Sequence, residues 1–437
     1  MTRKGKILNL VLGIALIATL FVGLIGCSSS GTSPTATPPS TQQTSTPTST
    51  ATLTEKTIKI GLITSLTGGS APWGFAERGI LEMYAKEVKD QGGLIIGNQR
   101  VNFDVISLDD QEGTPSAAVA DANQLVYQNS VDIIVTLWGG DAFAIAGILK
   151  AANANGVKTI EFTSGWSPMT VPSDPTVFRF ILDENAAAIA TVAAAHKLDP
   201  AAKTVVIVNP DIADGHNGDK ADTNAWLTEV PGGTVLDHVF YDTATVDYMP
   251  ISSRIMAHNP DCIDFSGSSP GSIVQIAAQC RSLGFTGLFP TGVATFDGAP
   301  EGMVTIGISP DYGNVTPLQK HYAEIFKQEY GQYYPFWEYY GNGLYPLFHN
   351  FFQDAGSTDI SKVYQTITAP GYTFDTWWAK SHWFGADVPI WNISRDIATD
   401  VPTLMYIKPT SAWPSGLQQL DTVPFSQIEP MYSGIKP

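Results

Sequence analysis

The chain has 437 residues and a formal net charge of −17, from 24 basic and 41 acidic residues. An acidic surface repels phosphate backbones, which argues against nucleic acid as a partner. Three cysteines without a Cys-x-x-Cys spacing and seven scattered histidines argue against a zinc site, so we expect no metal and no cofactor.

The N-terminus has the layout of a secretory signal. Bases within residues 3–6 precede an apolar run over residues 7–25. Its end, LIGC at residues 24–27, resembles the lipobox of bacterial lipoproteins. We therefore expect residues 1–26 to be a cleaved signal peptide and Cys27 to be lipidated, which anchors an extracytoplasmic protein to a membrane. The alternative is an uncleaved anchor helix, because the run is long enough to span a bilayer.

Residues 27–56 are expected to be a tether. They consist almost entirely of Ser, Thr, Pro, Ala, Gly and Gln, and the first charge is Glu55. Such a segment has too little apolar surface to offset the entropy of ordering. The folded part begins near Thr57, and its length suffices for two lobes.

From Thr57 onward, short apolar runs alternate with amphipathic stretches. The runs are rich in β-branched residues and predict strands at 58–64, 101–107, 131–138, 157–162, 177–182, 203–208, 233–240, 261–266 and 286–290. Helices are predicted at 77–93, 114–129, 141–155, 184–198, 270–283 and 317–329, with Thr114 as an N-cap before Pro115. This alternation predicts an α/β fold with parallel sheets and right-handed crossovers.

Cys262 and Cys280 are the only cysteines of the folded part. Cys262 opens a predicted strand, and Cys280 closes the helix that returns beside it, so both lie near one end of this unit. In an oxidising compartment such a pair can form a disulfide, and two buried free thiols are an equally open alternative.

Motifs of common enzyme classes do not occur in the chain. The loop after the first strand, SLTGGSAPWG, lacks the Gly-x-Gly-x-x-Gly pattern, and no Walker loop, Gly-x-Ser-x-Gly elbow or His-Glu-x-x-His is present. His216 is the most catalytic-looking histidine, but a solvated loop histidine is the commoner case. We therefore do not expect an enzyme.

Small residues and tryptophans share the loops that follow the predicted strands. In open α/β sheets, ligands bind at the carboxyl ends of the strands. The loops there are rich in Gly, Ser and Thr, yet they carry Trp73, Trp138, Trp166 and Phe296. Small residues let backbone N–H groups approach a ligand, and aromatic rings supply flat walls. We expect a shared pocket, although each ring taken alone is equally explained by packing.

The aromatic-rich stretch at 333–356 predicts a helix packed on the first lobe. Tyr339 and Tyr340 within it either pack in the core, which we favour, or reach the mouth of a cleft. Residues 373–385 and the strand-like TLMYIK at 403–408 are expected to return to the second lobe.

From Thr57 to about Phe296 the chain resembles the type I periplasmic solute-binding proteins, the leucine/isoleucine/valine-binding-protein-like receptors of ABC importers. The resemblance rests on the stretch from IKIGLITSLTGG to DANQLV, with its first strand, Thr-Gly loop, helix, Gly-Gly turn and Asp-Asp strand end in order. It implies two doubly wound parallel-sheet lobes joined by a multi-segment hinge, a ligand between them, a permease partner and a monomer. We expect lobe 1 at 57–180 and 312–366, and lobe 2 at 181–311 and 367–437.

The resemblance also implies which residues bind the ligand: Trp73, Gly139, Gly140, Asp141, Ser164, Gly165, Trp166, Ser167, Asp214, Ser268 and Thr291. Two positions depart from the family pattern. Asp141 stands where hydroxyls usually bind a carboxylate, and it either attracts an amine or caps the helix there, which we favour. Thr291 cannot pair with an ammonium group as an acid does. These departures favour aromatic, amide or amine-bearing solutes over a branched-chain amino acid.

The sequence therefore predicts an extracytoplasmic lipoprotein that captures a small organic solute, amino-acid-like, amide or aromatic, and delivers it to an ABC permease after hinge closure. A ligand sensor of the same fold is the alternative. An anchored hydrolase is less favoured, because no nucleophile with a base in reach is visible.

Overall fold

The computed structural model describes residues 53–165, 174–294, 296, 298–311, 313, 315–334, 336–384, 396–398 and 400–432. The expected signal peptide, Cys27, most of the tether, Trp166 and Ser167 lie outside these residues. Among the residues described, no helix is both long and apolar enough to cross a membrane.

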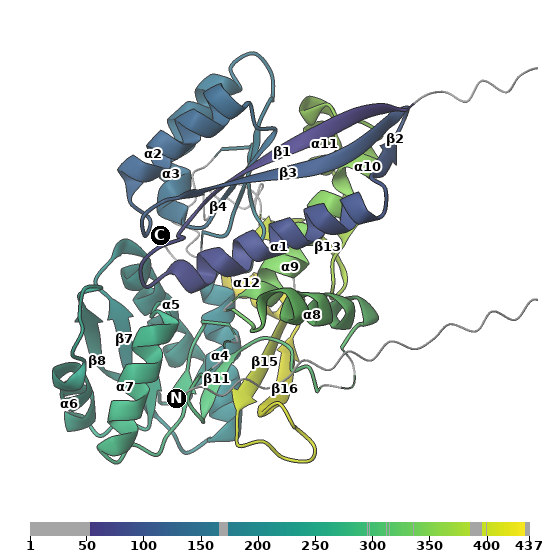
Figure 1. Cartoon of the computed structure of the whole chain (residues 1–437). Coiled ribbons are helices and arrows are strands. Elements are labelled where there is room, and N and C mark those ends of the chain that lie inside the picture. The colour runs from purple at the N-terminus through teal and green to yellow at the C-terminus, as the bar shows by residue number, and fades with distance from the viewer. Residues whose placement is uncertain are drawn as a thin grey trace, which may run out of the picture. The chain divides into compact units, whose positions relative to one another are not determined.

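The first lobe is built on a nine-stranded sheet (Figure 1). In order across the sheet, its strands are β12 (Thr373–Asp375), β13 (Lys380–Phe384), β14 (Asp396–Ile397), β6 (Val177–Arg179), β5 (Ile160–Thr163), β4 (Ile133–Thr136), β1 (Thr54–Thr64), β3 (Gln99–Asp109) and β2 (Leu94–Ile96). The strands from β14 to β3 pair in parallel, and β2, β12 and β13 pair antiparallel with their neighbours. This arrangement confirms the predicted parallel α/β fold.

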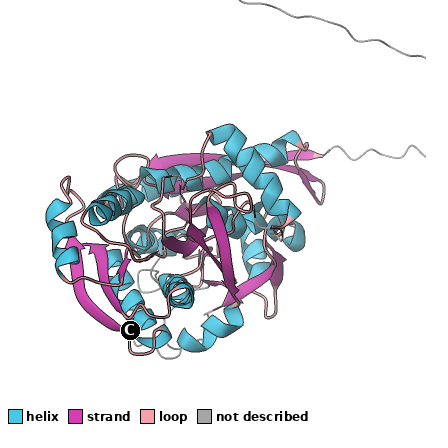
Figure 2. Cartoon of the chain, turned by 90° about the horizontal axis from the view of Figure 1, so that it is seen from below, coloured by secondary structure: helices cyan, strands magenta, loops and turns pink. Residues whose placement is uncertain are grey.

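Helices cover both faces of this sheet, and Figure 2 shows helices arranged around the strands of the chain. One face carries α1 (Ala71–Asp90), α8 (Pro317–Tyr330), α9 (Trp337–His349), α10 (Phe351–Ala355) and α11 (Ile360–Ile367), and the other carries α2 (Pro115–Asn123), a π-helical turn (Gln124–Asn129) and α3 (Gly139–Ala152). Alternate residues of a strand point to opposite faces. Ile60 and Leu62 of β1 therefore join the apolar cluster of the first face, and Ile63 joins that of the second.

Glycines bring α9 against the rest of the first lobe. A Cβ at Gly343 would lie 1.8 Å from the Phe180 carbonyl oxygen, and one at Gly341 would lie 2.1 Å from the Trp377 ring. The Tyr84 hydroxyl of α1 donates a 2.6 Å hydrogen bond to the Gly341 carbonyl. The aromatic stretch therefore packs on the first lobe, as predicted.

The second lobe contains two smaller sheets. The three-stranded one has the order β8 (Thr234–Tyr241), β7 (Thr204–Pro210) and β9 (Cys262–Asp264), all parallel. The four-stranded one has the order β10 (Phe289–Pro290), β11 (Met303–Ile306), β15 (Val401–Tyr406) and β16 (Leu417–Val423). The helices here are α4 (Glu184–Leu198), α5 (Ala213–Glu229), α6 (Met249–Ala257) and α7 (Pro270–Ser282), and α12 (Phe425–Tyr432) follows β16.

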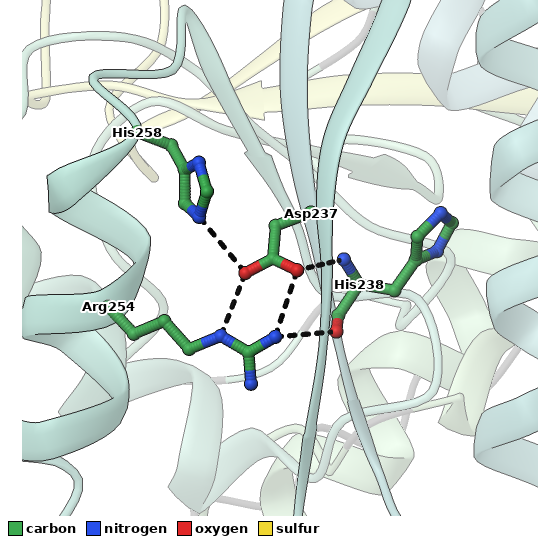
Figure 3. Close-up of polar contacts among 4 residues, drawn as sticks. All are labelled: Asp237, His238, Arg254 and His258. Carbon is green, nitrogen blue, oxygen red and sulfur yellow. Dashed lines mark hydrogen bonds and ion pairs between the residues drawn. The ribbon is translucent and has the colours of Figure 1, made fainter.

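A polar cluster attaches α6 to β8 (Figure 3). Asp237 accepts two hydrogen bonds from Arg254, at 2.8 and 2.9 Å, and lies 3.1 Å from His258 Nε2. Its partial burial opposes ionisation, but the hydrogen bonds and charge of Arg254 lower the pKa of Asp237 below its ordinary value. These contacts hold α6 against β8.

The structure differs from the sequence prediction in the C-terminal part of the first lobe. β12, β13 and β14, between residues 373 and 397, belong to the nine-stranded sheet, whereas 367–437 was expected in the second lobe. β15, which contains most of TLMYIK, does join a second-lobe sheet. The segment therefore divides between the two lobes, because the short strands after α11 complete the open edge beyond β6.

Cys262 and Cys280 are buried free thiols, so the disulfide alternative is wrong and the free-thiol alternative is confirmed. Cys262 packs in the cluster that contains Trp226 of α5, whereas Cys280 packs in the cluster that contains Ile263. Because adjacent strand residues point to opposite faces, Cys262 points away from the face on which α7 packs.

Candidate ligand-binding site

A cavity of about 120 Å³, here called the first cavity, lies at the carboxyl ends of strands from both lobes. Its walls come from the loops after β1, β3, β4 and β5, from those after β7, β8 and β9, and from the start of α9. A cavity of this order of size accommodates a molecule with a single ring. The predicted convergence of loops at the carboxyl ends is therefore present.

Two tryptophans form one wall of the first cavity. The rings of Trp73 and Trp138 meet edge to face, with centroids 5.5 Å apart at 82°. Trp138 Nε1 donates a 2.9 Å hydrogen bond to Ser65 Oγ, which donates to Asp110 Oδ1 at 2.7 Å. Trp73 is only 9% exposed, yet its Nε1 has no hydrogen-bond partner in the described part of the chain. One indole is therefore fixed, and the other presents an unused donor.

The first turn of α9 supplies two more rings, from Phe336 and Tyr340. Tyr340 is 3% exposed and packs in the core cluster, as the favoured interpretation predicts, and it also lines the cavity. Tyr339 points elsewhere and packs edge to face on Trp378 at 4.8 Å, as core packing predicts. Successive residues of a helix point about 100° apart, which separates the two tyrosines.

The second lobe contributes hydroxyl groups. Tyr241 OH and Ser266 Oγ are buried and make no hydrogen bond of ordinary geometry with the described residues. Ser269 also lines the first cavity, and its side chain accepts a hydrogen bond from the Ser272 N–H at the start of α7. Both lobes thus present buried polar atoms that a ligand can satisfy.

The charged groups lining the first cavity are acids. Glu112 and Asp214 line it, whereas no Lys, Arg or His appears among the described lining residues. Glu112 Oε1 accepts a 3.2 Å hydrogen bond from the Ser70 N–H at the start of α1. The lining therefore suits neutral or positively charged groups better than a free carboxylate.

Asp141 is buried and is not among the described residues that line the first cavity. It is the third residue of α3, whose N-cap is Trp138, so the N-cap interpretation of Asp141 is wrong because the helix starts earlier than predicted. Burial, followed by the charge of Asp110, raises the pKa of Asp141 to about 9. Asp141 is therefore protonated near neutral pH and carries no charge that would repel or attract a solute.

Several other residues that were expected to bind the ligand shape the surrounding loops and do not line the first cavity. A Cβ at Gly165 would lie 2.8 Å from Gly139 Cα, so these glycines let two loops touch. Ser268 Oγ donates to the Val208 carbonyl at 3.0 Å. Among the residues expected to bind the ligand, the described lining of the first cavity includes Trp73, Ser164 and Asp214. It does not include Gly139, Gly140, Gly165, Ser268 or Thr291.

Sequence reasoning missed residues that line the first cavity. Tyr241 and Thr243 follow the predicted strand at 233–240, and the rule that ligands bind at carboxyl ends would have included them. Glu112 directly follows the Asp-Asp end of β3. Phe336 comes from a helix distant in sequence, and no local signal indicates its position.

A family model described as periplasmic binding protein matches residues 57–389. The fold is similar to a leucine binding protein from Thermotoga maritima, with a TM-score of 0.66, 20% identity and coverage of 85% of this chain and 99% of that chain. It is also similar to an ABC-transporter solute binding protein from Rhodopseudomonas palustris in complex with 3,4-dihydroxy benzoic acid (TM-score 0.63, 19% identity, 84% and 96% coverage). A leucine-, isoleucine-, valine-, threonine- and alanine-binding protein from Brucella ovis in a closed conformation is similar too (TM-score 0.67, 15% identity, 87% and 97% coverage). A search of curated proteins finds no match.

Proposed function

Because the chain belongs to the periplasmic binding protein family, we propose that it captures a small organic solute in the first cavity and delivers it to the permease of an ABC importer. The observation that carries this proposal is the set of buried lining atoms that make no hydrogen bond of ordinary geometry with the described residues: Trp73 Nε1, Tyr241 OH and Ser266 Oγ. An unsatisfied buried polar group costs about 1–3 kcal/mol. A solute that bonds to these atoms removes that cost and connects the two lobes.

The lining favours an aromatic, amide or amine-bearing solute. Trp73, Trp138 and Phe336 supply flat apolar walls, and Asp214 and Glu112 supply negative charge. Amino acids and an aromatic acid are the ligands named for the similar proteins. A solute held only by a free carboxylate would face the two acids, so we propose that the ligand of this chain is neutral or carries an amine.

Binding is proposed to close the lobes about the hinge. Arg179 at the end of β6 pairs with Asp183 at 3.3 Å, and both side chains are buried. Asp183 also accepts the Asn185 and Ala186 N–H groups at the start of α4. This contact stiffens the segment between β6 and α4, where the chain passes from the first lobe to the second. We propose that closure bends the backbone beside this segment. Signal cleavage, lipidation of Cys27, an extracytoplasmic location and a monomeric state belong to the same proposal.

The test is a ligand screen of the purified full-length chain against amino acids, amides, polyamines and small aromatic acids. Melting temperature and tryptophan emission are followed together, since a ligand of the folded state raises the melting temperature by mass action. We expect one chemical class to change both signals. In Trp73→Ala the affinity should fall by roughly tenfold or more, and in Trp73→Phe by a few-fold through loss of one hydrogen bond.

Trp413→Phe is the matched control, because Trp413 is not among the described residues that line the first cavity. The affinity of this variant for the ligand should equal that of the wild type. Unchanged affinity in Trp73→Ala would remove the first cavity as the binding site. Loss of uptake of the same compound in cells without the protein separates an importer from a sensor, since a sensor leaves uptake intact.

A further inference from the structure

A second cavity, of about 510 Å³, shares the first turn of α9 with the first cavity. Phe336 and Tyr340 line the first cavity, and Trp337 and Glu338 of the same turn line the second. Its remaining walls come from α8, from the loop between β10 and β11, from the segment between β11 and α8, and from β15 and β16. It is the larger of the two cavities, and the binding of a solute in the first cavity makes no use of it.

A buried carboxyl group lies in the wall of the second cavity. Glu338 is 4% exposed, and its Oε2 accepts a 3.1 Å hydrogen bond from the Ile308 N–H. Burial raises the pKa of Glu338 to about 8, against the opposing effect of the Ile308 N–H. No described cationic side chain contributes to this environment. A buried acid is normally paired with a cation, and within the described structure this one is not.

A second acceptor lies in the same cavity. Gln319 of α8 is 3% exposed, and its Oε1 accepts no hydrogen bond from any described residue. Its backbone N–H bonds to Thr316 Oγ1 at 3.1 Å, which fixes the residue in the first turn of the helix. The cavity therefore contains two buried acceptor groups, and the one cation among its described lining residues, Lys320, is exposed.

Aromatic rings complete the wall. Trp337 is 3% exposed and stacks on Tyr333, with centroids 4.7 Å apart at 18°. Phe296 lines the cavity and is held by Tyr406, whose hydroxyl accepts from the Phe296 N–H and donates to its carbonyl, both at 2.8 Å. Faces of aromatic rings attract organic cations as well as apolar groups.

The turn between the two cavities is strained. Phe336 has φ of 63°, in the left-handed region that a bulky residue rarely adopts. This conformation brings the Cβ atom too close to the following carbonyl oxygen. Strained residues of this kind cluster at ligand sites, and this residue immediately precedes Trp337 and Glu338.

We propose that the second cavity binds a small arylalkylamine, with the Glu338 carboxylate as counter-ion, Gln319 Oε1 as an acceptor for the ammonium group, and Trp337 and Phe296 as walls for the ring. The proposal does not depend on what binds in the first cavity. An ammonium group supplies the positive charge that the buried part of the described lining lacks, and the acidic chain attracts cations.

The test is calorimetric titration of the purified full-length chain with 2-phenylethylamine at pH 7, using 2-phenylethanol as the neutral analogue. We expect saturable binding of the amine at least roughly tenfold tighter than that of the alcohol, since the charge pair forms in a buried site. Glu338 is mostly protonated at pH 7, so binding should release about one proton, measured from the heats in two buffers of different ionisation enthalpy.

Glu338→Gln keeps an acceptor for the Ile308 N–H, so it should fold, bind the amine roughly tenfold more weakly and release no proton. Ala323→Phe is a second variant, which fills the cavity from α8 and should abolish binding. Glu329→Gln, on α8 but outside the cavity lining, should bind like the wild type. The proposal is overturned by absence of saturable binding, by equal binding in wild type and either cavity variant, or by loss of binding in Asp214→Asn, which would place the amine in the first cavity.

Discussion

Glu161 allows the energetic consequence of a buried acid to be measured directly. It lies in β5 and is fully buried. Its Oε1 accepts a 2.9 Å hydrogen bond from Thr136 Oγ1, and its Oε2 has no partner among the described residues. Burial raises the pKa of Glu161 to about 8, with the Thr136 hydrogen bond opposing and the charge of Asp174 adding to the rise.

The sign of the pH dependence follows from this raised pKa. The folded chain keeps a proton that the unfolded chain releases above its ordinary pKa of 4.5. The contribution of Glu161 to the free energy of unfolding is therefore fully present below about pH 4.5 and is lost as the pH rises toward about 8. At about 1.4 kcal/mol per unit of pKa difference, raising the pH from about 5.5 to about 8 removes roughly 3 kcal/mol of unfolding free energy through this one residue.

Glu161→Gln keeps an acceptor for Thr136 and cannot titrate. Raising the pH between these two values lowers the unfolding free energy of both proteins, and we expect the decrease in the variant to be smaller than that in the wild type by roughly 3 kcal/mol. Other buried acids titrate in both proteins, so their effects cancel in the comparison except at Asp141, whose raised pKa includes a contribution from the charge of Glu161. Guanidinium unfolding followed by circular dichroism at both pH values measures the difference, and exposed Glu301→Gln is the control. Equal pH dependence in wild type and Glu161→Gln would refute the reasoning.

Gly343→Ala should lower the free energy of unfolding by at least roughly 1–3 kcal/mol, because the new Cβ would collide with the Phe180 carbonyl. Gly147→Ala is the control, since a Cβ there has open space on α3 and the variant should melt no lower than the wild type. Arg179→Met should lower the unfolding free energy by roughly 3–5 kcal/mol, since it removes the buried guanidinium that pairs with Asp183; a variant as stable as the wild type in urea would contradict this. The two buried thiols should resist a thiol reagent at pH 8 until the chain is denatured, because burial raises their pKa values to about 12 and about 11. Rapid labelling of the folded chain would show that they are accessible.

The alternation of strands and helices was predictable from local pattern. Predicted runs such as 184–198 and 270–283 coincide closely with α4 and α7, because apolar periodicity and caps are local signals. α5 was not predicted, and His216 near its start was expected in a loop. Gly215 and Gly218 interrupt its pattern, and tertiary packing against β7 and α4 makes the helix despite them.

The site was predictable only in part. The carboxyl-end rule located Trp73, Ser164 and Asp214, because it depends on sheet topology that the sequence reveals. Phe336 was not predicted, and Tyr340 was considered only as the less favoured alternative, because the fold brings α9 to these loops from far along the chain. The environment of Asp141 also depends on neighbours such as Asp110 that only the fold brings together.

The nine-stranded sheet has a consequence for how the chain assembles. β1 begins at Thr54, β14 ends at Ile397, and the bond between Tyr84 and Gly341 joins residues 257 positions apart. Most of the second lobe is thus inserted within the first, and the chain returns to the second lobe with β15 and β16 after β14. The first lobe therefore completes its sheet only after most of the chain has been synthesised. Non-local pairing of this kind slows folding. A fragment that ends before Thr373 would leave β6 as an open edge, which is a template for pairing with other chains.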